Sequence, residues 1–290
     1  MNRTHHHSTL ALVCAAALLQ LAAASPVAAA DYSVRSLVDS TSGISFIALP
    51  VIDDADTVYF GGAVPQPNDP LNPARGNIYQ VRNGVLTPST FLLNSSGNIS
   101  QLAVTRGGVV TFNGSGFTVN DVRTPQGIYR MDPAGTVTRV IDDAGPYLGI
   151  GNFAAARSDA TTPPLAFTSS TDTGGFTTAI YNGPDPLANK VVDGTSPFGP
   201  ILATSLQSLA ADGTPRLIGT KPGAGTPVIY KGPDPQRDVV MDLSRFSNVF
   251  NYQENSTGDA RFVAQLPSGV VGLYSGPDPS PTDCSTAPPA

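Results

Sequence analysis

Aspartate is the residue type that offers this chain the most chemistry, and its copies recur at related positions. An aspartate or asparagine follows an aliphatic residue at the end of an expected strand in five places: Asp39, Asn94, Asp142, Asp193 and Asp242. A ring of carboxylates could hold a cation, but calcium needs about six to eight oxygens at one point, and these positions fall in separate repeats. We interpret them as Asx-type turns, in which the carboxylate bonds to nearby backbone.

Adjacent carboxylates offer a second kind of chemistry. The segments Asp53-Asp54-Ala55-Asp56 and Asp142-Asp143 are local acidic clusters. A glycosidase uses two carboxyl groups, one with its pKa raised by an apolar pocket. The spacing of a calcium-binding loop is absent from both clusters. No pair is singled out by its sequence context, so a carbohydrate-active hydrolase with paired aspartates stands as the alternative function.

Other catalytic groups are scarce. His5, His6 and His7 all lie near the start of the chain, and Cys284 lies near its end. A domain between them has no histidine for a Ser-His-Asp or Cys-His arrangement, nor for a His/Cys zinc site. The net charge of −6 lacks the basic footprint of a nucleic-acid binder. We therefore expect no cofactor, no metal and no nucleic-acid partner.

The first thirty residues have the pattern of a secretory signal. Residues 10–24 are apolar except for Gln20, and they are too short to span a bilayer comfortably. Small residues at 28–30 match a signal-peptidase site. We expect a signal peptide over residues 1–30, a single domain over 31–275 and a disordered polar tail over 276–290. No second hydrophobic segment follows, which indicates a secreted or periplasmic protein without a transmembrane segment in its mature form.

The elements that must position these residues are short strands in a repeated unit. A tyrosine after an aliphatic residue recurs about every fifty residues, at Tyr79, Tyr129, Tyr181, Tyr230 and Tyr274. Each unit has four short β-branched and aromatic segments between turn residues, which is typical of strands. In the second unit these are residues 99–104, 108–112, 127–130 and 136–141. The second strand recurs around Phe60, Phe112, Phe167, Ile218 and Val263.

This pattern predicts an all-β fold, a five-bladed β-propeller of four-stranded blades. The fifth unit ends after its third strand, whereas residues 32–39 resemble the fourth strand of the other units. We expect the N-terminal strand to complete the last blade and close the ring, which removes an exposed edge. An open solenoid is the alternative architecture.

The motif Gly-Pro-Asp-Pro occurs at residues 183–186, 232–235 and 276–279, always just after the tyrosine. Proline presets the backbone of a turn and aspartate bonds to nearby backbone. We interpret the motif as the turn between the third and fourth strands rather than as a calcium site.

The connections between the second and third strands differ among the repeats, and variable loops on a rigid scaffold commonly bind ligands. The candidate ligand-binding residues in these loops are Asp69, Arg75, Asn120, Asp121 and Arg123. Drift of solvent-exposed loops is the alternative explanation of their variety.

Several segments resemble the tandem repeats of secreted bacterial choice-of-anchor proteins. The resemblance is carried by residues 153–167, by Ser208-Leu-Ala-Ala-Asp-Gly213 and by the Ile-Tyr and Val-Val-Asp that follow. It implies an exported, β-propeller-like protein, and it supplies no catalytic residue. We therefore expect a non-enzymatic binding or interaction module that contacts a glycan or an envelope protein, with a structural envelope component as a third reading.

Overall fold

The structure is a computed structural model. It describes residues 43–46, 50–65, 74–89, 98–116, 118–119, 122–170, 178–197, 205–210, 212–254 and 259–275. The chain divides into two units, residues 1–36 and 37–290, and every described residue belongs to the second.

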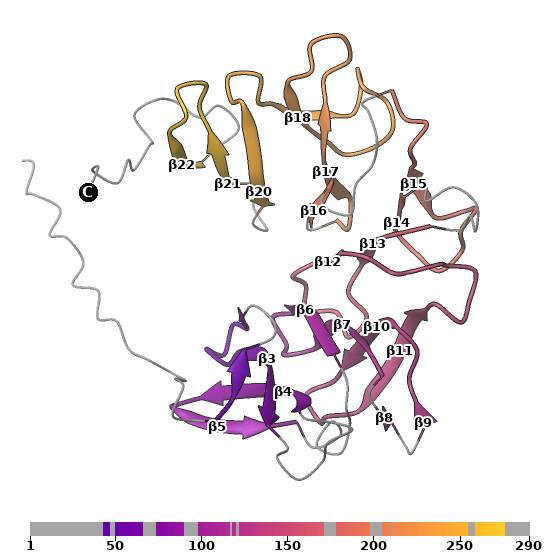
Figure 1. Cartoon of the computed structure of the whole chain (residues 1–290), viewed down its shortest axis with the longest axis vertical. Helices are drawn as coiled ribbons and strands as arrows, with labels where there is room; N and C mark the ends of the chain where they lie inside the picture. Colours follow the sequence, from indigo (N-terminus) through magenta and orange to yellow (C-terminus); the bar gives the residue numbers. More distant parts are fainter. Residues whose placement is uncertain are drawn as a thin grey trace, which may run out of the picture. The chain divides into compact units, whose positions relative to one another are not determined.

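The described part of the chain is all-β and forms a five-bladed β-propeller, as the sequence predicted (Figure 1). No α-helix occurs among the described residues. In those same ranges, no helix is long and apolar enough to cross a membrane.

Each blade is an antiparallel sheet built from consecutive strands. The first blade contains β1 (Ser45–Phe46), β2 (Val51–Ile52), β3 (Val58–Pro65), β4 (Ala74–Arg82) and β5 (Val85–Pro88). The second contains β6 (Asn98–Val104), β7 (Val110–Ser115), β10 (Gly127–Met131) and β11 (Val137–Asp142), and a ribbon of β8 (Thr118–Val119) and β9 (Val122–Arg123) extends between β7 and β10.

The remaining blades follow the same order. The third contains β12 (Phe153–Ala155), β13 (Leu165–Ser169), β14 (Ala179–Tyr181) and β15 (Lys190–Val192). The fourth contains β16 (Leu206–Leu209), β17 (Pro215–Thr220), β18 (Pro227–Tyr230) and β19 (Val239–Asp242). The fifth has three described strands, β20 (Asn248–Glu254), β21 (Ala260–Gln265) and β22 (Val271–Ser275). Residues 32–39, which we expect to complete it, lie outside the described residues.

The recurrent tyrosine stacks on the second strand of its own blade. Tyr79 lies opposite Phe60, with ring centroids 5.4 Å apart, and the second, third and fifth blades repeat this pair. The equivalent positions in the fourth and fifth blades are Leu217 and Phe262. Ile218 and Val263, around which the second strand is expected, lie within β17 and β21, one position after the residues that face the tyrosine. Neighbouring positions of a strand point to opposite faces of the sheet.

Consecutive blades from the first to the fifth are joined by apolar interfaces. The residue before the tyrosine packs on the aromatic pair of the next blade, so that Ile78 contacts the cluster of Phe112 and Tyr129. Ile128 and Ile229 do the same for the third and fifth blades, whereas Ile180 packs with Leu217 and Tyr230 of the fourth. All four isoleucines are 0% exposed. Burial of each such side chain contributes about 1.5–3 kcal/mol. The equivalent residue of the fifth blade, Leu273, is 53% exposed.

Glutamine side chains join the first strands of neighbouring blades. Gln101 in β6 donates to the carbonyl of Phe153 at 2.7 Å and accepts from its N–H at 3.0 Å. Gln207 in β16 accepts from the N–H of Tyr252 in β20 at 3.1 Å. Because β12 and β20 are edge strands of their sheets, these bonds give their backbone groups a hydrogen-bond partner.

Candidate functional site

The predicted ligand-binding residues lie mostly beyond what the structure describes. Asp69 lies between β3 and β4 and Asn120 and Asp121 lie between β8 and β9, all outside the described residues. Arg75 of β4 pairs with Val64 of β3, and Arg123 of β9 pairs with Thr118 of β8, although the side chains of the two arginines are not described. The grouping of these five residues therefore stays a prediction.

The described residues form a cleft elsewhere, between the first and second blades. Its volume is about 630 Å³. One wall comes from β3, β4 and β5 of the first blade, including Tyr59, Gln80, Arg82 and Thr87. The other wall comes from two turns of the second blade, at residues 106–108 and 131–135. These turns join first to second and third to fourth strands, so the cleft opens at the edge of the sheets opposite the predicted loops.

A tight hairpin fixes the first wall. Asn83 and Gly84 have φ values of 52° and 78°, which is the pair of positive angles that a two-residue turn between twisted strands requires. Gln80 lies opposite Thr87 and Arg82 lies opposite Val85. Because alternate residues of a strand share a face, all four side chains face the cleft together.

Asp53 and Tyr59 form the floor of the cleft, and their polar groups are already engaged. The Oδ1 of Asp53 accepts from the N–H groups of Ala55 at 2.9 Å and Thr57 at 2.8 Å. Its Oδ2 accepts from the Tyr59 hydroxyl at 3.2 Å. Burial, and then the neighbouring Asp53 carboxylate, raise the pKa of Tyr59 to about 12. Tyr59 therefore stays neutral at physiological pH and donates to Asp53.

The second wall is lined with small residues and one further carboxylate. Gly108 has a φ of +80°, and a Cβ atom there would lie 3.3 Å from the Tyr59 hydroxyl. Asp132 Oδ1 accepts from the N–H of Thr136 at 2.8 Å and so closes its own turn. Both carboxylates of the cleft thus form structural hydrogen bonds to the backbone.

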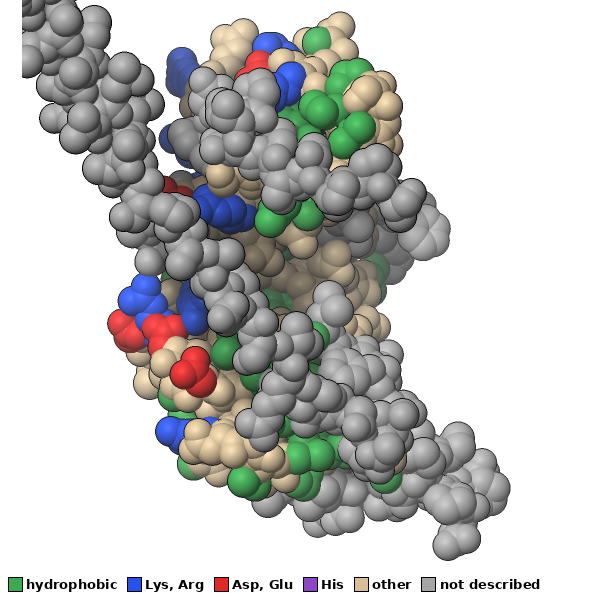
Figure 2. Space-filling model, turned by 90° about the vertical axis from the view of Figure 1, so that its left-hand side faces the viewer, with side chains coloured by type: hydrophobic (Ala, Val, Ile, Leu, Met, Phe, Trp, Pro, Cys, Tyr) green, Lys and Arg blue, Asp and Glu red, His purple; other side chains and the backbone are tan. Residues whose placement is uncertain are grey.

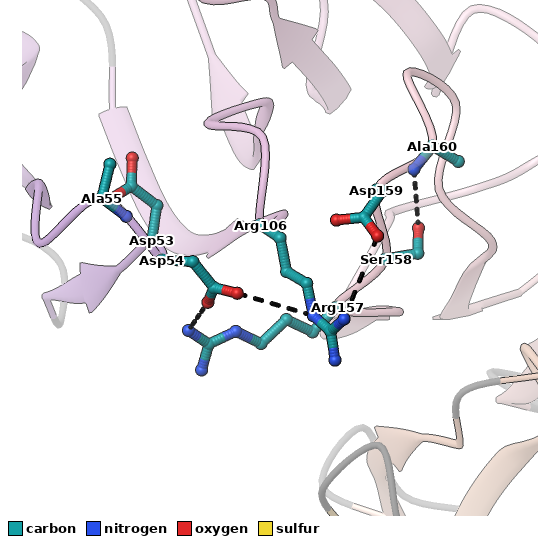
Figure 3. A network of polar contacts seen from close by, with 8 residues as sticks. All are labelled: Asp53, Asp54, Ala55, Arg106, Arg157, Ser158, Asp159 and Ala160. Atoms are coloured by element: carbon teal, nitrogen blue, oxygen red, sulfur yellow. Dashed lines mark hydrogen bonds and ion pairs between the residues drawn. The ribbon is translucent and has the colours of Figure 1, made fainter.

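Arg106 belongs both to the cleft and to an ion-pair network that joins three blades (Figure 3). Its Nε lies 3.6 Å from Asp54 of the first blade and its Nη1 lies 3.9 Å from Asp159 of the third. Asp54 also pairs with Arg157 at 2.5 Å. Acidic and basic side chains likewise lie next to one another on the face in Figure 2. These side chains are 37–80% exposed, so the network orients Arg106 more than it stabilises the fold.

The Gly-Pro-Asp-Pro segments are turns, as predicted, wherever the structure describes them. Asp185 Oδ1 accepts from the N–H groups of Leu187 and Ala188, and Asp234 Oδ1 accepts from those of Gln236 and Arg237. The third copy, residues 276–279, lies outside the described residues.

The strand-end aspartates also bond to nearby groups, as expected. Asp193 accepts from the N–H of Thr195 and from Lys190, and Asp242 accepts from the N–H of Ser244 and from Lys221. Asp142 accepts from Arg139 at 2.8 Å instead. Asp39 and Asn94 lie outside the described residues. In the described ranges no three His, Cys, Asp or Glu side chains gather as a metal site requires.

The electrostatics of the aspartates bear on the hydrolase alternative. A hydrogen bond from Lys190, then one from Thr195, lower the pKa of Asp193 to about 2. The pKa of four other aspartates is lowered by hydrogen bonds from backbone or lysine: Asp185, Asp212, Asp234 and Asp242. A glycosidase acid needs its pKa raised, so these five aspartates are unsuited to that role.

Sequence reasoning missed Tyr59, Arg82 and Arg106 because they come together only in the assembled blades. The signal available was the Asn83-Gly84 turn, which places Arg82 at the tip of a rigid hairpin. The acidic run beginning at Asp53 is visible in the sequence, but no local pattern relates Asp53 to Tyr59.

No protein-family model matches the chain, and no curated protein matches it by sequence. Among solved structures, it is similar to virginiamycin B lyase from Staphylococcus aureus, with 14% identity, a TM-score of 0.35, and coverage of 82% of this chain and 71% of that one. A candidate gluconolactonase has 12% identity, a TM-score of 0.38, and coverage of 85% and 93%.

A puromycin-hydrolysing peptidase from Mycobacterium tuberculosis has 11% identity and a TM-score of 0.38, with 83% of this chain and 46% of that one covered. The chain thus spans less than half of the peptidase. Likeness at this level carries no argument about activity, and the fold assignment rests on the strands and their pairing.

Proposed function

We propose that this chain is an exported, non-enzymatic binding module that holds a saccharide in the cleft between its first and second blades. The proposal rests on how the polar groups of the cleft are hydrogen-bonded and oriented. Asp53 and Asp132 are engaged by backbone N–H groups. Gln80, Arg82 and Thr87 face the cleft from one rigid sheet. A ligand pocket commonly combines a partly apolar lining with a few such convergent polar groups.

Export is proposed from the leader-like residues 1–30 and from the resemblance to choice-of-anchor repeats. The loops that carry Asp69, Arg75, Asn120, Asp121 and Arg123 are proposed as a second contact surface. They would take an envelope protein or a longer part of the glycan. The hydrolase that uses paired aspartates remains the competing function.

A panel of polysaccharides tests the proposal on the purified mature protein, with retention and product release scored together. The cleft variant is Thr87→Trp, because Thr87 is exposed on β5 and lines the cleft. The matched control is Val239→Trp, which places the same side chain at an exposed position of β19.

We expect retention of a saccharide without product, a loss of at least about tenfold in affinity for Thr87→Trp, and no change for Val239→Trp. Unchanged saccharide binding by Thr87→Trp would indicate that the saccharide binds at the predicted loops and not in the cleft. Product release that an Asp→Asn substitution abolishes would establish the hydrolase instead.

A further inference from the structure

The charged groups of the cleft are unequal in what they offer a ligand. Asp53 accepts three hydrogen bonds, from two backbone N–H groups and the Tyr59 hydroxyl. Asp132 accepts from the N–H of Thr136. Neither carboxylate therefore needs a ligand to satisfy it.

The arginines differ from the carboxylates in this respect. Arg82 is exposed, lines the cleft, and has no carboxylate partner within the described ranges. Arg106, on the opposite wall, lies 3.6 and 3.9 Å from the two described carboxylates that it faces, which are ion-pair distances rather than good hydrogen bonds. Among the described residues, each guanidinium thus keeps donors free for a ligand, although the chain as a whole carries a net charge of −6.

We infer that the saccharide bound in this cleft is acidic, and that Arg82 and Arg106 bind the carboxylates of its uronic acid residues from the two walls. This inference rests on the proposed function and names its ligand class. A guanidinium presents two parallel N–H donors to a carboxylate, which gives both strength and orientation. Gln80 and Thr87, on the same face as Arg82, are placed to bond to the hydroxyl groups of the sugar.

An acidic peptide carries the same carboxylate chemistry, but the first wall is poorly built for one. A peptide would bind most readily by adding a strand to the open edge of β5. That strand ends in Pro88, which has no N–H to donate, and the N–H of Ser89 already donates to the carbonyl of Ile78 at 2.8 Å. A saccharide needs no strand edge.

The test compares ligands that differ only in charge. Trimers of galacturonate and of mannuronate are titrated calorimetrically into the mature protein, each beside its methyl ester, with a hexaglutamate peptide as the peptide probe. The variant is Arg82→Gln. The control is Arg237→Gln, because the Arg237 side chain is 88% exposed on the fourth blade and lies 3.6 Å from Asp234.

We expect an acid trimer to bind at least about tenfold more tightly than its ester, and its affinity to fall as salt rises. Arg82→Gln should lose about tenfold for the acid and nothing for the ester, whereas Arg237→Gln should match the wild type.

Equal binding of acid and ester, or full affinity in Arg82→Gln, would overturn the inference while leaving a saccharide-binding module intact. Tighter binding of hexaglutamate than of either trimer would show that the ligand of this cleft is an acidic peptide rather than a saccharide. No retention of any acidic or neutral saccharide would overturn the proposed function as well.

Discussion

The ion pair between Arg216 and Glu254 should be the most sensitive polar contact between blades. Arg216 lies in β17 of the fourth blade and Glu254, the only glutamate of the chain, ends β20 of the fifth. The Nε–Oε2 distance is 2.5 Å and the Nη2–Oε1 distance is 3.0 Å, and the two side chains are 11% and 10% exposed. Tyr252 adds a hydroxyl bond to Oε2 at 3.3 Å.

Replacing Glu254 with glutamine leaves the Arg216 guanidinium charged, buried and without its counter-ion. Removal of one partner of a buried pair costs about 3–5 kcal/mol, and the amide oxygen retains one acceptor, so we expect a loss of about 3 kcal/mol. For a domain of this size that lowers Tm by roughly 6–12 °C. The chain has no tryptophan, so unfolding is best followed by circular dichroism or tyrosine fluorescence.

Two controls separate the pair from general damage. Asp242→Asn removes the carboxylate from an exposed pair with Lys221, where the side chains are 41% and 51% exposed, and should cost no more than about 1 kcal/mol. The double variant Arg216→Met with Glu254→Leu should recover most of the loss, because no buried charge remains. A Glu254→Gln protein no less stable than Asp242→Asn would refute the reasoning.

Three further predictions concern backbone and pH. A Cβ atom on Gly127 would collide with the carbonyl oxygen of Ile141, whereas one on Gly107 meets nothing within 4 Å; thermal melts should show Gly127→Ala to be destabilised by about 2 kcal/mol or more and Gly107→Ala to be nearly neutral. Burial is the first cause that raises the pKa of Tyr59, Tyr129, Tyr147 and Tyr252 to about 12. The stability this contributes is present below pH 10 and is lost as pH rises toward 12, so the urea midpoint should fall over that window while absorbance at 295 nm reports late tyrosine ionisation. The pKa of Asp193 is lowered from 3.8 to about 2, first by the hydrogen bond from Lys190. The stability that this carboxylate contributes is present above about pH 4 and is lost as pH falls toward 2. In Asp193→Asn the urea midpoint should therefore depend less on pH over that range.

Much of the fold was readable from the sequence because the blades repeat. In the second unit the four expected strands match β6, β7, β10 and β11 to within a few residues. The second strands of the fourth and fifth blades also lie where the sequence predicts them, but the residues that face the tyrosine are Leu217 and Phe262 rather than Ile218 and Val263. Register depends on the turns and bulges between strands, and the similarity of sequence between repeats does not reveal these.

The cleft could not be read in the same way. Arg82 and Arg106 lie in different blades, and no local pattern relates one to the other. Arg82 can bind a ligand only if nearby carboxylates have other partners. Asp53, for example, accepts hydrogen bonds from backbone N–H groups of its own turn. Such partners are known only from the folded structure. The variation between the repeats instead predicts binding by the loops between the second and third strands.

The contact of each isoleucine with the tyrosine of the following blade and the residue opposite that tyrosine makes the interface, rather than the blade, the cooperative element of this protein. A single excised blade would expose its isoleucine on one face and its tyrosine on the other. The smallest fragment with one complete apolar interface is therefore two consecutive blades. Gene truncations should accordingly be designed to retain adjacent blades together. A circular permutant that opens the chain between β11 and β12 would keep Ile128 and Phe167 in one molecule while separating them to opposite ends of the sequence.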